Sequence, residues 1–156
     1  MILLDQTILF HPEDDKTNHV IPFTLSRDCV KLEFACSYTP KVIQDEALKR
    51  WAVLSNIGRY VPRYQLPLYQ DMYDQVEDLV NLLTLSLDYE DQYLGCAHRH
   101  APIQTHFLSA KQSSPGFLRH HPAAGDYRAV INIHSITSPE VAFHLVITAL
   151  FEEETV

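Results

Sequence analysis

The sequence predicts a mainly β fold, an antiparallel β-sandwich of jelly-roll or immunoglobulin-like type with a short two-helix insertion. Several short segments alternate apolar and polar residues with a period of two, which is typical of half-buried strands. Turn-forming residues separate these segments, as they do in all-β domains. The chain lacks the regular alternation of strands and helices that would indicate a parallel sheet.

Seven or eight strands are expected along the chain. Residues 30–36 have the clearest pattern, because four apolar residues there alternate with two charged residues and an alanine. Pro22 indicates that its strand lies at a sheet edge or contains a bulge, since proline has no N–H to donate to a neighbouring strand. The predicted strands are residues 2–10, 19–25, 29–36, 83–88, 93–98, 103–109, 127–136 and 141–150.

Residues 44–79 carry a helical pattern that interrupts the strands. Apolar residues recur every three or four positions in two runs, which predicts two short helices. We expect Pro62 and Pro67 to break the chain between them. We also expect the face of the second helix to lie against a sheet, or otherwise to form an apolar patch for a partner or a second copy. The first run is Ala47, Trp51, Leu54 and Gly58, and the second is Tyr69, Met72, Tyr73, Val76 and Val80.

Length and composition favour one globular domain, residues 1–156, with a sizeable core. Hydrophobic residues make up 46% of the chain and charged residues 21%. Twelve basic and 20 acidic residues give a net charge of −8, which argues against a nucleic-acid partner because such proteins need a basic face. The chain has neither a signal-peptide pattern nor an apolar run of about 20 residues, so we expect a cytoplasmic protein with no membrane partner.

Several runs in the predicted strands resemble those of a known family. They are residues 20–25 and 29–34, closed by Tyr38-Thr39-Pro40; residues 81–88, followed by Gly95 and Arg99; and residues 114–117 and 125–134. Together these runs resemble the N-terminal β-sandwich that precedes the catalytic domain in PHP-type (polymerase and histidinol phosphatase) metallohydrolases of the carbaryl-hydrolase-like branch. The resemblance covers about two thirds of the chain.

This resemblance implies a non-catalytic accessory or binding module. The metal ligands of the family lie in the catalytic domain that would follow, whereas this sequence ends at Val156, so no catalytic residue carries over. The implied partner is a separately encoded hydrolase, and the implied ligand is a small molecule such as a glycan. Self-association through the helical insertion is a separate possibility, which rests on the apolar face of its second helix and not on the resemblance. Two features depart from the family pattern: the insertion is longer, and Cys96 stands where the family tends to have tryptophan.

The sequence His98-Arg99-His100 supports an alternative function in metal binding. Residues two apart on a strand point to the same side, so both imidazoles could reach one divalent metal such as Zn, Fe or Mn. His106 is a candidate third ligand, as are His120, His121 and His134. However, no carboxylate follows the second histidine, as the metal motif of cupin jelly rolls requires. The other interpretation places these histidines at strand ends without a ligand, and no cofactor is then expected.

Exposed aromatic residues are a second kind of candidate site. The aromatic residues that flank the central loops are Tyr89, Tyr93, Phe107, Phe117 and Tyr127, and aromatic rings can stack on the apolar face of a sugar. The predicted ligand-binding residues are Tyr93, Arg99, Phe117 and Tyr127. Packing in the core or in hairpins is the alternative role for these rings. The sequence has no nucleophile elbow and no glycine-rich phosphate loop, and Cys29, Cys36 and Cys96 are predicted to be packed free thiols. The prediction therefore favours a protein without catalytic activity.

Overall fold

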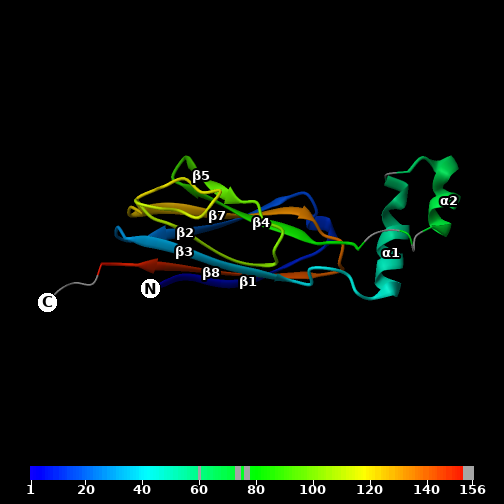
Figure 1. The fold of residues 1–156 in the computed structure, drawn as a ribbon, viewed down its shortest axis with the longest axis horizontal. Helices are drawn as coiled ribbons and strands as arrows, with labels where there is room; N and C mark the ends of the chain where they lie inside the picture. The colour runs from blue at the N-terminus through cyan, green and yellow to red at the C-terminus, as the bar shows by residue number, and fades with distance from the viewer. Residues whose placement is uncertain (60, 73–74, 76–77, 153–156) are drawn as a thin grey trace.

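Eight strands form two antiparallel four-stranded sheets that face each other in the computed structural model, which describes residues 1–59, 61–72, 75 and 78–152 (Figure 1). This confirms the predicted β-sandwich. The first sheet has the order β1 (Ile2–Phe10), β8 (Val141–Leu150), β3 (Lys31–Thr39) and β6 (Ile103–Leu108). The second sheet has the order β2 (Asn18–Leu25), β7 (Gly125–Ser135), β4 (Leu82–Tyr89) and β5 (Gln92–Ala97).

The strand order decides between the two predicted types of sandwich. The first strand pairs with the last, β2 pairs with β7, β3 with β6, and β4 with β5. This nested antiparallel pairing is the arrangement of an eight-stranded jelly roll. The immunoglobulin fold distributes its strands differently between its sheets. The protein is therefore a jelly roll.

The core lies between the two sheets and consists of the side chains that alternate along each strand. On β8, Val141, Phe143, Leu145, Ile147 and Ala149 point inward, and each is at most 1% exposed. Residues of the opposite sheet pack against the same core. Burying one large apolar side chain is worth about 1.5–3 kcal/mol, so this alternation explains why the predicted strands form.

Residues 109–124 connect the two sheets along one side of the sandwich. Ser113 forms a bridge with Leu108 at the end of β6, and Phe117 forms one with Gly95 in β5. The N–H of Cys96 donates to the carbonyl of Gly116, 3.0 Å away. Gly116 has a φ of +101°, and a Cβ added there would lie 2.3 Å from the carbonyl oxygen of Cys96. This close approach of two backbones requires glycine.

We predict that Gly116→Ala lowers the free energy of unfolding by at least about 2 kcal/mol, because the methyl group collides with backbone and φ is unfavourable. Gly58→Ala is the matched control, since a Cβ at Gly58 meets nothing within 4 Å. The free energy of unfolding of Gly58→Ala should equal that of the parent or exceed it by up to about 1 kcal/mol. Urea unfolding followed by circular dichroism measures both, and equal effects of the two substitutions would contradict the prediction.

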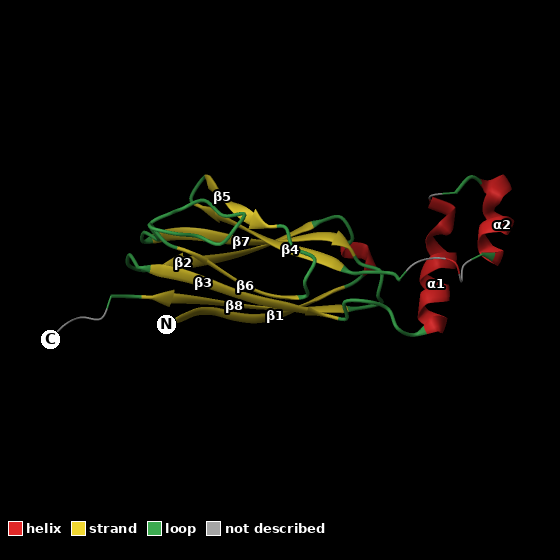
Figure 2. Ribbon diagram, in the orientation of Figure 1, coloured by secondary structure: helices red, strands yellow, loops and turns green. Residues whose placement is uncertain are grey.

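The helical insertion lies beyond one end of the sandwich, opposite the end where β1 begins and β8 ends (Figure 2). It contains α1 (Glu46–Asn56) and α2 (Leu66–Asp71), joined by the short 3-10 helices Ile57–Arg59 and Arg63–Gln65. The side chain of Asp45 caps α1 by accepting from the N–H of Leu48. A further 3-10 helix, Pro12–Asp14, lies between β1 and β2.

Of the two alternatives for the second helix, packing against a sheet is wrong, and the expected start of that helix is wrong as well. The helices do not cover a face of either sheet, and Tyr69 is 44% exposed (Figure 1). The second helix also begins earlier than predicted, because Pro67 lies in its first turn, where a missing N–H costs nothing. Tyr73 and Val76 of the predicted face lie outside the described residues.

Asn81 attaches the insertion to the sandwich. The two ends of the insertion run antiparallel through a bridge between Val42 and Val80. Beside this bridge, the fully buried Asn81 side chain donates to the carbonyl of Pro40 and to the Ser138 hydroxyl, at 3.0 and 2.6 Å. Its Oδ1 accepts from the N–H groups of Thr137 and Ser138 and from the Thr137 hydroxyl. One amide thus joins three segments of the chain.

We predict that Asn81→Ala lowers the free energy of unfolding by about 2–4 kcal/mol, because it leaves several buried polar groups without partners. Asn18→Ala removes an amide from an exposed position of β2 and serves as the control, with a change within about 0.5 kcal/mol. Chemical denaturation measures both variants. A loss in Asn81→Ala no larger than in the control would refute the role of this amide.

Candidate functional site

The three predicted metal-ligating histidines lie in two different environments. The His106 ring is buried between the sheets, where it bonds Gln104 at 2.9 Å and packs on Phe117. The rings of His98 and His100 are 6.4 Å apart, and both residues are exposed after β5. Within the described ranges, no group of three or more His, Cys, Asp or Glu side chains could hold a metal. The structure therefore does not bring His106 to the other two.

Burial lowers the pKa of His106 from 6.5, and the charge of Arg99 lowers it further. The unfolded chain consequently binds more protons than the folded chain just below pH 6.5. The stability that neutral His106 contributes to the folded chain is fully present above about pH 6.5. It is lost as the pH falls from there toward the lower pKa that His106 has in the folded chain. His106 thus makes folding sensitive to acid.

We predict that His106→Leu reduces the loss of stability between pH 7 and 5, because leucine has no proton to bind. At pH 8, where His106 is neutral in both states, the difference in unfolding free energy between the variant and the parent measures the separate cost of losing the hydrogen bond to Gln104. Some acid dependence should remain, since burial also lowers the pKa of His120 and His134. An unchanged slope of stability against pH would show that His106 is not an acid-sensitive group.

The four predicted ligand-binding residues do not form one surface. Tyr127 is fully buried, and its hydroxyl donates to the carbonyl of Ala123. Phe117 is 9% exposed and stacks on Phe34 in the core. Tyr93 is 58% exposed and Arg99 is also exposed, so these two alone of the four face solvent.

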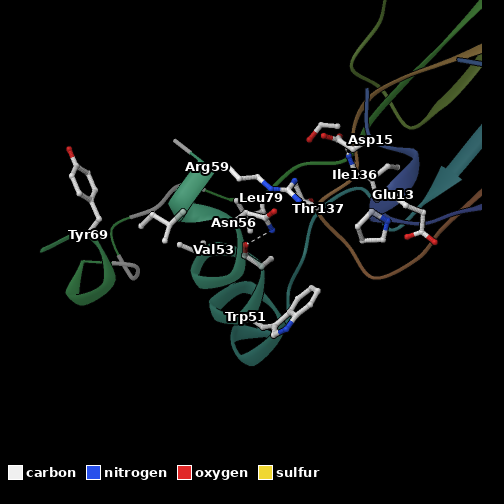
Figure 3. A pocket seen from close by; sticks show the side chains of 14 residues that line it. Glu13, Asp15, Trp51, Val53, Asn56, Arg59, Tyr69, Leu79, Ile136 and Thr137 are labelled. Carbon is white, nitrogen blue, oxygen red and sulfur yellow. Dashed lines mark hydrogen bonds between the residues drawn. The ribbon is translucent and has the colours of Figure 1, made fainter. Parts of the chain in front are cut away.

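A pocket of about 570 Å³ lies between α1 and the end of the sandwich (Figure 3). Trp51, Asn56 and Arg59 line it from the side of the insertion, together with the largely apolar Ala52, Val53, Ile57, Tyr69 and Leu79. The sandwich contributes residues from the 3-10 helix after β1 and from the end of β7 with the loop that follows. These are Pro12, Glu13, Asp15, Ser135, Ile136 and Thr137.

The polar groups of the pocket include both donors and acceptors of hydrogen bonds. Arg59 brings a guanidinium group, and Glu13 and Asp15 bring carboxylates. Asp15 is held in place because one of its oxygens accepts from the N–H of Ile136 at 2.8 Å. Trp51 adds an indole that is 53% exposed. A ligand here would meet an aromatic face together with polar groups on both sides.

Sequence reasoning did not find this pocket. It assigned Trp51 to the apolar face of a helix, and a local pattern of this kind does not reveal which distant segment lies opposite. The one available signal was Trp51 itself, the single tryptophan of the chain.

The fold and pocket define this chain as a jelly-roll β-sandwich with a pocket formed by its helical insertion. Comparison with protein-family models, with curated proteins and with solved structures gives no significant match. Among the described residues, no helix has both the length and the apolar character needed to span a membrane.

Proposed function

We propose that this protein is a non-catalytic binding module that holds a small polyhydroxylated ligand, such as a short glycan, in the pocket beside α1. The exposed indole of Trp51 within that pocket is the observation that carries the proposal. A volume of about 570 Å³ falls in the range of small-molecule sites. The resemblance to the sandwich module of PHP-type hydrolases supports an accessory role, with a separately encoded hydrolase as the proposed protein partner.

Trp51 supports a ligand with one apolar face. An indole left half-exposed on a helix keeps a large apolar surface in water, and a flat ligand that stacks on it removes that surface. The pyranose ring of a sugar has such a face, formed by its C–H groups. Since Trp51 lies on α1, a helix with a capped start, the backbone that carries the indole is held in place by that helix.

The polar lining supports a neutral ligand with many hydroxyl groups. A hydroxyl can donate to the carboxylates of Glu13 and Asp15 and can accept from the guanidinium of Arg59. A strongly anionic ligand would face two carboxylates against one guanidinium. The balance of charge therefore favours sugars over phosphates or nucleotides.

The proposal predicts a fluorescence change on titration with neutral disaccharides. Trp51 is the only tryptophan, so the emission of the unmodified chain reports on this pocket alone. Maltose, cellobiose and diacetylchitobiose are suitable probes, and at least one should shift the emission to shorter wavelength in a saturable manner as the indole is dehydrated. Arg59→Ala should weaken the Kd by about 10-fold, because a hydrogen bond to a charged group is lost.

Arg63→Ala is the matched control for Arg59→Ala. Arg63 is also an exposed arginine of the insertion but does not line the pocket, so its removal should leave the Kd unchanged. The proposal fails if none of the three disaccharides produces a saturable change. It also fails if the two arginine variants lose affinity equally.

A further inference from the structure

The outer face of the second sheet carries a polar cluster that spans β4. Thr84 and Ser86 alternate with the inward Leu83, Leu85 and Leu87, so they face away from the core, yet they are only 2% and 6% exposed. They are buried because longer side chains of the neighbouring strands close over them.

These neighbouring side chains come from both sides of β4. Asn132 of β7 donates to the Ser86 hydroxyl at 3.1 Å and to the sulfur of Cys96 in β5 at 3.9 Å. The Thr84 hydroxyl lies 3.7 Å from the same sulfur. Small residues on the central strand thus allow side chains of β5 and β7 to meet.

Two histidines meet at the edge of this cluster. His134 of β7 is fixed by a 2.9 Å hydrogen bond between its Nε2 and the Thr84 hydroxyl. The ring of His98, which follows β5, lies 5.2 Å from the ring of His134 and nearly perpendicular to it. The ring of His100 lies 6.4 Å from the ring of His98.

The separation of His98 and His134 matches that of two ligands of one tetrahedral metal. Zinc–nitrogen bonds of about 2.0–2.1 Å, at tetrahedral angles, place two imidazole centroids about 5 Å apart. The hydrogen bond to Thr84 also resembles the outer contact that orients many metal-binding histidines, since in the tautomer whose Nε2–H donates to this hydroxyl the Nδ1 lone pair is free to bind a metal.

We propose that His98 and His134 form a surface site for a divalent transition metal such as zinc, with His100 completing the site by rotation of its exposed side chain. His100 is needed because the described residues contain no preformed group of three ligands. This site differs from the predicted combination of His98, His100 and His106, because His106 lies between the sheets. It is independent of the pocket beside α1.

Isothermal titration of the chelator-treated chain with Zn²⁺ tests the proposal. One saturable site is expected, and His98→Ala and His134→Ala should each weaken the Kd by at least about 10-fold. Thr84→Val replaces the hydroxyl that orients His134 with a methyl group, and it should also weaken zinc binding by about 10-fold. In the same titration with Co²⁺, the intensity of the visible absorption should fall in His100→Ala, because a ligand of the tetrahedral site is lost.

His144→Ala is the control for adventitious binding by a surface histidine. His144 lies on the outer face of the first sheet and pairs with Asp5 at 2.8 Å, so its loss should leave the Kd unchanged. Because His98 is exposed, His98→Ala should fold even if His134→Ala does not. Zinc binding with the parent affinity in His98→Ala would overturn the proposal, and so would the absence of a saturable site in the parent chain.

Discussion

The buried amide of Asn81 is the interaction on which the position of the helical insertion depends. A single side chain satisfies the carbonyl of Pro40, the Ser138 hydroxyl and two N–H groups of the loop before β8. The two paired ends of the insertion, around Val42 and Val80, form an antiparallel stalk, in which the N–H of Asn81 donates to the carbonyl of Lys41. Because these bonds are shielded from water, the stalk and the end of the sandwich form one unit, and the pocket lies between that unit and α1.

Strand β4 shows how one sequence pattern serves two surfaces. Its leucines point into the core, and the threonine and serine between them support the outer cluster. Larger residues at these two outer positions would occupy the space in which Asn132 meets Cys96, and a side chain without a hydroxyl at position 84 would lose the hydrogen bond to His134. The alternation that builds the core therefore also makes room for polar chemistry on the opposite face.

The strands could be predicted closely because their signal is local. Residues 141–150 are predicted and observed as one strand, since every second side chain is buried. The insertion was predicted less well. Its helices are short, and the apolar runs on which the prediction relied are only partly buried: Trp51 faces solvent, Leu54 and Met72 are half-buried, and Tyr73 lies outside the described residues. Aromatic residues were the hardest to assign, because Tyr127 and Tyr93 have similar sequence surroundings but opposite exposures.

The sequence by itself determined the class of fold, the positions of the strands and the presence of a helical insertion, because hydrophobic periodicity acts over a few residues. Only the tertiary structure decided that the sandwich is a jelly roll, that His98 lies beside His134 while His106 is buried, and that Trp51, Glu13 and Asp15 line one pocket. Each of these outcomes depends on the pairing of segments far apart in the chain. The free energy of burying both sheets together selects that pairing, and no local pattern records it.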